Sequence, residues 1–142
     1  MQAIILAGGK GTRLKPYTTI LPKPLMPILE IILRQLKASG FTSVILAVGY
    51  MSQIFESLFQ DGSRFGLKIN YSLEEKPLGT AGPLALAVDR LEDNFLVMNG
   101  DLLTTLNFKN LFQHHLSSKA AATIAVHRRT VHIDYGVIEY DE

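Results

Sequence analysis

The 142-residue sequence predicts an α/β fold, with a mostly parallel, Rossmann-like sheet and helices on both of its faces. Strand-like and helix-like segments alternate along the chain, and this order is typical of a parallel sheet with right-handed crossovers. The first strand-like segment is apolar along most of its length, as expected of a strand buried on both faces. The chain is also long enough for one domain with a substantial core.

The first half of the chain is expected to contain three strands and two helices. Gln2–Leu6 is rich in apolar, β-branched residues and predicts a buried strand, and the next strand is expected at Ser43–Val48. Apolar residues recur at helical spacing in Ile28–Ser39, which a glycine ends, and in Ser52–Phe59. Leu67–Leu73 alternates in polarity and predicts a half-exposed strand.

The second half continues this alternation. Thr80–Leu91 is expected to be a helix whose first residue, a threonine, is the N-cap. Phe95–Met98 predicts a strand and Asn107–Leu116 predicts a helix. Two further strands are expected at Ala121–His127 and Gly136–Tyr140.

The composition excludes several classes of function. The sequence has 47% hydrophobic and 19% charged residues and a net charge of +1, so no bulk attraction to nucleic acid or to a membrane is expected. It has no cysteine, which excludes disulfides, thiolate catalysis and cysteine-ligated metals. The histidines match no zinc spacing. With no signal peptide and no membrane-spanning run, the cytoplasm is the expected compartment.

A glycine-rich segment directly after the first predicted strand is the most informative part of the sequence. Glycines let a backbone approach a ligand closely, and successive N–H groups in such a turn form a concavity that binds anions. Lys10 and Arg13 add positive charge, and a guanidinium can grip phosphate oxygens in a bidentate manner. A binding loop for a nucleoside triphosphate is therefore predicted. It reads Leu6-Ala7-Gly8-Gly9-Lys10-Gly11-Thr12-Arg13-Leu14.

Two other phosphate loops fit this segment poorly. The Walker A loop requires G-x-x-x-x-G-K-[ST], and no lysine followed by Ser or Thr stands at that spacing. The dinucleotide fingerprint requires glycine at Leu14 and an acidic residue at the end of the next strand, which instead reads Val48-Gly49-Tyr50. A glycine-rich turn without a ligand is the remaining alternative.

Four motifs in a fixed order identify a third kind of phosphate loop. They are Gly8-Gly9-Lys10-Gly11-Thr12-Arg13-Leu14, Leu21-Pro22-Lys23-Pro24-Leu25-Met26-Pro27, Leu78-Gly79-Thr80-Ala81-Gly82-Pro83-Leu84 and Met98-Asn99-Gly100-Asp101. Together they resemble the sugar-phosphate nucleotidylyltransferases, or NDP-sugar pyrophosphorylases, along the whole chain. Because of Glu74-Glu75, the sequence is most similar to the mannose-1-phosphate guanylyltransferase-like branch.

The resemblance implies a reaction in which a nucleoside triphosphate and a sugar 1-phosphate form an NDP-sugar and pyrophosphate. The attacking phosphate is already ionised at neutral pH, so the protein must position two polyanions and neutralise charge. By resemblance, Arg13 and Lys23 are the catalytic residues. Asp101 is implied to bind magnesium (Mg2+), and the backbone of Gly136 to face the sugar. The residues implied in nucleotide binding are Leu6, Ala7, Gly8, Gly9, Gly11, Thr12, Glu74 and Gly79.

Glu74 favours GTP, although dTTP and UTP stay open. A carboxylate only accepts hydrogen bonds. Guanine presents two adjacent donors that one carboxylate could meet together, whereas uracil and thymine present a single N–H. Many relatives that take pyrimidine nucleotides have Gln at this position. A surface glutamate beside Glu75 is the structural alternative.

The implied site residues are expected to lie at one edge of the sheet. The glycine loop, the Glu74–Gly79 segment and Asp101 all fall at or just after the ends of predicted strands. In open parallel sheets, ligands bind beyond the carboxyl ends of the strands. Independent motifs therefore converge on the carboxyl edge.

The chain departs from the family at two places. Relatives usually have several more residues around Pro27-Ile28-Leu29-Glu30, in a loop that approaches the sugar phosphate. The chain also ends at Glu142, before the family's second metal-binding Asp and its Glu-Lys-Pro motif. We therefore expect residues 1–142 to form a single nucleotidyltransferase domain that is an N-terminal fragment of a longer one, with weak or absent turnover.

A non-catalytic regulatory or assembly module of the same fold is the main alternative, although intact Arg13, Lys23 and Asp101 favour an enzyme. A cytidylyl- or molybdopterin-type nucleotidyltransferase would share the glycine loop but lack the Pro22-Lys23-Pro24 and Gly79-Thr80-Ala81 combination. The sequence leaves the sugar, the base and the oligomeric state open, a homo-oligomer included.

Overall fold

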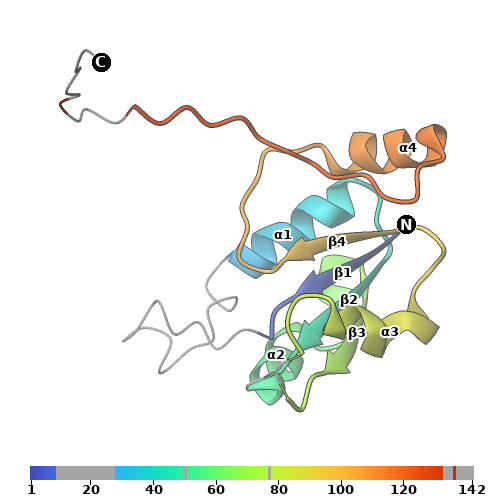
Figure 1. The fold of residues 1–142 in the computed structure, drawn as a ribbon. Helices are drawn as coiled ribbons and strands as arrows, with labels where there is room; N and C mark the ends of the chain where they lie inside the picture. Colours follow the sequence, from blue (N-terminus) through green and yellow to red (C-terminus); the bar gives the residue numbers. More distant parts are fainter. Residues whose placement is uncertain (9–27, 50, 77, 133–135, 137–142) are drawn as a thin grey trace.

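One parallel sheet organises the molecule. The computed structural model describes residues 1–8, 28–49, 51–76, 78–132 and 136. Within them, four strands form a parallel sheet in the order β3-β2-β1-β4 (Figure 1). The α/β class is confirmed, and the strands before residue 100 match their predicted bounds to within one residue. They are β1 (Gln2–Leu6), β2 (Ser43–Val48), β3 (Lys68–Leu73) and β4 (Phe95–Asn99).

Helices cover both faces of this sheet, as predicted. They are α1 (Ile28–Ala38), α2 (Ser52–Phe59), α3 (Gly82–Ala87) and α4 (Phe108–Ser118). Side chains of α1, α2 and α4 share the larger apolar cluster, whereas α3 packs into a smaller cluster on the other face. None of the helices in the described ranges is both long enough and apolar enough to span a bilayer.

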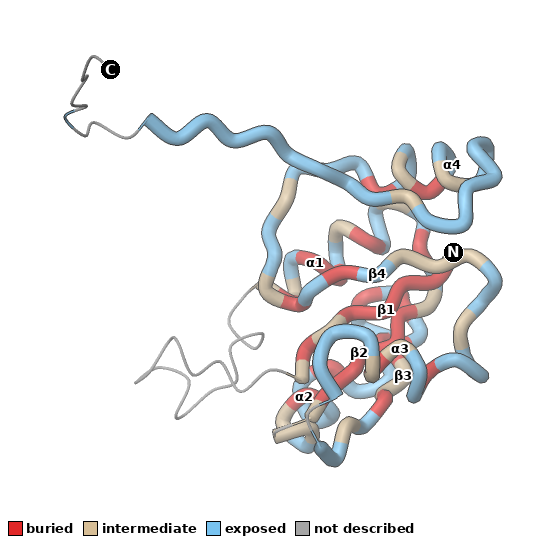
Figure 2. Tube along the Cα trace, viewed as in Figure 1, coloured by how far each residue is buried: buried red, intermediate tan, exposed pale blue. Residues whose placement is uncertain are grey.

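Side chains of the central strands alternate between the two clusters. Ile5 and Leu46 belong to the larger cluster, and Ile4 and Ile45 to the smaller one. All four are fully buried. Successive strand residues point to opposite faces, so a strand covered on both sides is apolar at nearly every position. This explains the apolar runs of β1 and β2, which Figure 2 shows as mostly buried.

Gln2 is the polar residue of β1, and its buried side chain has partners at both ends of its amide. Its Nε2 donates to the carbonyl oxygen of Arg90 at 2.9 Å, and its Oε1 accepts from the N–H of Glu92 at 2.7 Å. Buried polar atoms are normally paired in this way, because leaving one unpaired costs stability. Gln2 thereby ties the start of β1 to the segment that leads into β4.

The predicted helix from residue 80 to 91 is shorter than expected, and Thr80 is not its N-cap. The helix α3 begins at Gly82 after Ala81, and a 3-10 turn at Val88–Arg90 follows it. An N-cap hydroxyl at Thr80 would need the N–H of residue 82 or 83 as its donor. Pro83 has no N–H and is suited to the first helical turn, so it favours the later start.

The predicted strand at Ala121–His127 is also wrong. This segment forms no strand in the described part of the chain, and Ile124 and Val126 are 81% and 89% exposed. Period-two alternation gives a strand only where a neighbour supplies the other half of the hydrogen-bond ladder. A contact of 2.9 Å between Nδ1 of His115 and Oγ1 of Thr123 joins the segment to α4. Of the strand expected at Gly136–Tyr140, only its first residue is described, and it belongs to no strand.

The stability of the fold is expected to fall at high pH because of Tyr71 on β3. Its hydroxyl donates to the carbonyl oxygen of Gln60 at 2.7 Å. Burial, with smaller contributions from the carboxylates of Glu56 and Asp61, raises the pKa of Tyr71 to about 12. The folded state therefore holds this proton more tightly than the unfolded state, whose tyrosine has a pKa near 10. The stabilisation is complete below pH 10 and is lost between pH 10 and about 12.

Denaturant unfolding of wild type and Tyr71→Phe between pH 9 and 12 measures this contribution. Because the sequence has five tyrosines, the difference between the two proteins is the informative quantity. The free energy of unfolding should fall more steeply for wild type above pH 10. Parallel pH profiles would contradict the assignment.

Candidate nucleotide site at the carboxyl edge of the sheet

The strands end along one line. In the register of the sheet, Leu6 of β1 is level with Ala47 of β2 and with Asn99 of β4, and Ala47 is level with Ser72 of β3. Each of these residues is the last or next-to-last of its strand. The N–H of Ala7 also donates to the carbonyl oxygen of Ala47 at 2.8 Å. The segments after all four strands therefore start from the same edge, as predicted.

Backbone hydrogen bonds continue the sheet by one residue into these segments. The N–H of Glu74 donates to the carbonyl oxygen of Val48 at 2.8 Å, and the N–H of Gly100 donates to that of Leu6 at 2.9 Å. The first bond fixes the backbone at Glu74, and the second fixes it at Gly100, directly before Asp101. The carboxyl edge is therefore organised by the sheet itself.

The strand order places two predicted site residues at the switch point of the sheet. From β1 the chain builds β2 and β3 on one side and then β4 on the other. Ligands of open α/β sheets bind in the crevice where the order reverses in this way. Gly8 follows β1 and Asp101 follows β4, so they flank that point.

Three segments pack closely at this edge. A Cβ added to Gly8 would lie 3.0 Å from Oε2 of Glu74 and 3.5 Å from the backbone nitrogen of Gly49. A Cβ added to Gly49 would lie 3.3 Å from the carbonyl oxygens of both Gly8 and Glu74. Neither glycine has a positive φ, so close packing rather than backbone conformation favours glycine at these two positions. Gly49 is not among the predicted site residues, although a glycine directly after a strand is a signal of close backbone approach.

Glu74 is connected to the segment that carries Gly79. Its Oε1 accepts a hydrogen bond from the N–H of Leu78. Gly79 has a φ of +75°, and a Cβ added there would meet no atom within 4 Å. The space beside this glycine is open, which suits a ligand that approaches its backbone closely.

Asp101 carries a half-buried carboxylate beyond the end of β4. Among the described residues, no group of three or more His, Cys, Asp or Glu side chains could hold a metal ion. Magnesium commonly binds proteins through one or two carboxylates and completes its coordination with water and phosphate oxygens. A single carboxylate fits this pattern, so the donor present is compatible with Mg²⁺.

Several predicted site residues lie outside the described part of the chain. They are Gly9, Gly11, Thr12, Arg13 and Lys23. Leu6, Ala7, Gly8, Glu74, Gly79 and Asp101 are described, and all belong to or follow the carboxyl ends of strands. Gly136 is described as an exposed residue, with no atom within 4 Å of an added Cβ.

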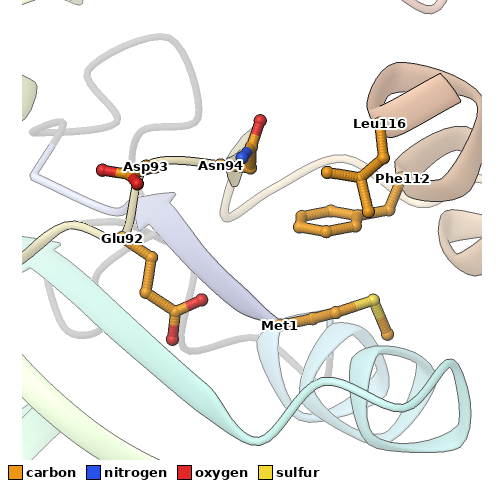
Figure 3. A pocket seen from close by; sticks show the side chains of 6 residues that line it. All are labelled: Met1, Glu92, Asp93, Asn94, Phe112 and Leu116. Carbon is orange, nitrogen blue, oxygen red and sulfur yellow. The ribbon is translucent and has the colours of Figure 1, made fainter. Parts of the chain in front are cut away.

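A separate cleft lies at the opposite, amino edge of the sheet. Its volume is about 310 Å³, and Figure 3 shows Met1, Glu92 and Asp93 around it, with Phe112 and Leu116 from α4. The two carboxylates disfavour a triphosphate there.

Comparison with known proteins shows the family to which the chain belongs. The family model described as "Nucleotidyl transferase" matches residues 2–142. The chain belongs to the nucleotidyl transferase family. The glycine loop and the segments after β3 and β4 are thus parts of a nucleotidyl transferase domain.

Relatives of this nucleotidyl transferase include two mannose-1-phosphate guanylyltransferases. The catalytic subunit beta from Danio rerio is 42% identical over 99% of the chain, and the enzyme from Mycobacterium tuberculosis is 38% identical over all of it. The chain spans 42% and 41% of the lengths of these two proteins. The first alignment is 150 positions long, so that relative has residues in this range that the 142-residue chain lacks.

Solved structures of the same fold include nucleotide and sugar complexes. A protein from Bacillus anthracis named as a glucose-1-phosphate thymidylyltransferase, in complex with sucrose, has a TM-score of 0.76 and 26% identity. The match covers 84% of this chain and 52% of that one. HddC from Yersinia pseudotuberculosis, complexed with GMP-PN, has a TM-score of 0.72 and 30% identity over 81% of this chain and 54% of its own.

Gly49→Ala is expected to lower the free energy of unfolding by about 1–3 kcal/mol, because the new methyl group would press on two backbone carbonyl oxygens. Urea denaturation measures the loss. Gly136→Ala is the control, since a Cβ added there has open space. Equal stability of the two variants would show that the edge is not closely packed at Gly49.

Proposed function

We propose that this protein is a sugar-1-phosphate nucleotidyltransferase, which converts a nucleoside triphosphate and a sugar 1-phosphate into an NDP-sugar and pyrophosphate. The family match and the names of its relatives support this reaction class. The proposal rests most on one observation. Gly8, Glu74 and Asp101, which are far apart in the sequence, all follow strands that end at the same carboxyl edge, and Gly8 and Asp101 flank its switch point.

In the proposed reaction, an oxygen of the sugar 1-phosphate attacks the α-phosphorus of the triphosphate. The bond from this phosphorus to the bridging oxygen breaks, and pyrophosphate leaves with the electron pair. No general base is needed, because the attacking phosphate is already ionised at neutral pH. Catalysis then depends on holding two anions in line and on stabilising the charge of the transition state.

The residues of the glycine loop supply most of the proposed phosphate contacts. Backbone N–H groups from Gly8 to Thr12 cradle the triphosphate, in the manner of other glycine-rich anion sites, and Leu6 and Ala7 lead the chain to it from β1. Arg13 binds phosphate oxygens near the bond that breaks, and Lys23 binds phosphates from the other side. Both act by binding the transition state more strongly than the bound substrates. Gly136 contributes backbone contacts to the sugar.

Asp101 is the proposed ligand of Mg²⁺. When bound, this ion supplies positive charge to the phosphate oxygens and helps to neutralise the departing pyrophosphate. Asp101 follows β4, so it lies on the opposite side of the switch point from β2 and β3. The carboxylate alone would repel the triphosphate, so nucleotide binding at this edge should depend on a divalent cation.

GTP and mannose 1-phosphate are the favoured substrates, with GDP-mannose as the product. Relatives named mannose-1-phosphate guanylyltransferase and a neighbour that holds GMP-PN support this pair. The neighbour named as a thymidylyltransferase keeps dTTP and glucose 1-phosphate as the alternative pair. A cytoplasmic location and a homo-oligomeric state remain predictions.

A pyrophosphate-release assay of the full-length protein tests the reaction class, because residues 1–142 alone are expected to turn over weakly or not at all. GTP, dTTP, UTP and ATP are each combined with mannose or glucose 1-phosphate, with and without Mg²⁺. We expect release with at least one pair only when Mg²⁺ is present. We also expect Arg13→Ala to lower kcat by about 10²–10³-fold at unchanged thermal stability, because it removes charge stabilisation of the transition state.

Lys119→Ala is the control for that variant, since it removes an exposed cation after α4. Retained activity in Arg13→Ala would remove this residue from the mechanism. No pyrophosphate release with any pair, together with normal nucleotide binding, would favour a regulatory module of the same fold.

Glu74→Gln tests the choice of base. The amide replaces one acceptor by a donor, so the pair of guanine donors loses one partner. The ratio of kcat/KM for GTP to that for dTTP or UTP should fall by about 10-fold or more, the value of one hydrogen bond to a charged group. Unchanged ratios across the nucleotides would show that Glu74 does not read the base.

A further inference from the structure

We infer that Glu74 is also a positioning residue, which holds the Leu78–Gly79 backbone against the glycine loop for every nucleotide, whatever its base. This inference rests on the proposed function, because it concerns the same nucleotide site. Positioning and base recognition use the carboxylate of Glu74 in different ways. Oε1 organises the segment that contacts the nucleotide, whereas base selection requires the whole carboxylate to face guanine.

The first support is the hydrogen bond that closes the segment after β3. Oε1 of Glu74 accepts from the N–H of Leu78, the residue directly before Gly79. At its other end, the N–H of Glu74 donates to the carbonyl oxygen of Val48 on β2 at 2.8 Å. Glu74 is thus anchored to the sheet through its backbone and holds Leu78 through its side chain.

The second support is the position of the other carboxylate oxygen. Oε2 lies where a side chain on Gly8 would begin, 3.0 Å from an added Cβ. The carboxylate therefore lies between Leu78 and the first glycine of the phosphate loop. One side chain contacts the segments after β1 and β3 at once, and it is half-buried there.

The third support is the exposure of the segment that is held. Leu78 and Gly79 are exposed, and the Gly79 backbone has open space around its Cα. Among the described residues, the N–H of Leu78 donates to Oε1 of Glu74, and the side chain of Leu78 lies against Gly82. Exposed backbone with few contacts is the kind of segment that opens locally at low cost. Loss of the Glu74 acceptor should therefore loosen Gly79 while leaving the sheet intact.

Two substitutions separate positioning from base reading. Glu74→Gln keeps an Oε1 acceptor for the Leu78 N–H, whereas Glu74→Ala removes it. Glu75→Ala is the matched control, because it deletes a neighbouring exposed carboxylate. All four proteins are compared by NMR amide exchange at Leu78 and by the Kd for GTP, dTTP and UTP with Mg²⁺.

We expect Glu74→Ala to speed exchange of the Leu78 amide by about 10-fold and to raise the Kd for all three nucleotides by a similar factor. This is the scale of one lost hydrogen bond to a charged acceptor. Wild type, Glu74→Gln and Glu75→Ala should keep slow exchange at Leu78, and the melting temperature should change little. Where turnover is measured, Glu74→Ala should raise KM for each nucleotide far more than it lowers kcat.

Unchanged Leu78 exchange in Glu74→Ala would overturn the inference, whether or not nucleotides bind. Faster Leu78 exchange with an unchanged Kd for every nucleotide would overturn it as well, because the segment would then have no role in binding. If wild type binds none of the nucleotides, the proposed function fails. Amide exchange at Leu78 still tests the hydrogen bond to Glu74 in that case. A Kd that rises for GTP alone would assign Glu74 to base reading only.

Discussion

The backbone ladder of the parallel sheet is the constraint on which the site depends. Hydrogen bonds from Ala7, Glu74 and Gly100 carry the ladder past the strand ends, so that three loops leave the sheet from fixed positions. Close contacts between Gly8, Gly49 and Glu74 then leave little room for side chains on the two glycines. A packed backbone of this kind can present N–H groups to a ligand without large rearrangement, which is what charge stabilisation requires.

Much of the fold follows from local pattern in the sequence. Apolar runs predicted β1 and β2 because both faces of these strands are covered, and helical spacing predicted α1 and α2. The start of α3 depended on a finer detail, the missing N–H of Pro83, which hydrophobic spacing does not register. The segment from Ala121 to His127 has the alternation of a strand but no paired neighbour in the described chain, and pairing is not encoded in one segment alone.

The candidate site was only partly predictable from the sequence. Motif order predicted which residues belong to it, and the rule that ligands bind beyond strand ends predicted where the described ones lie. The structure added what spacing cannot supply, namely that Glu74 contacts both Leu78, four positions later, and Gly8, 66 positions earlier in the sequence. It also gave Gly49 a packing role, because such a role appears only when three strand ends are brought together. The roles of Arg13 and Lys23, which their motifs imply, are proposals.

The place where a nucleotide binds tests the proposed site at the carboxyl edge most directly. Backbone amide shifts can be followed by NMR while GTP and Mg²⁺ are added to the protein. The largest changes should fall on Gly8, Gly79 and Asp101, with little change at Glu92 and Asp93 in the cleft at the opposite edge. Changes concentrated in that cleft, with none at the carboxyl edge, would contradict the assignment of the site.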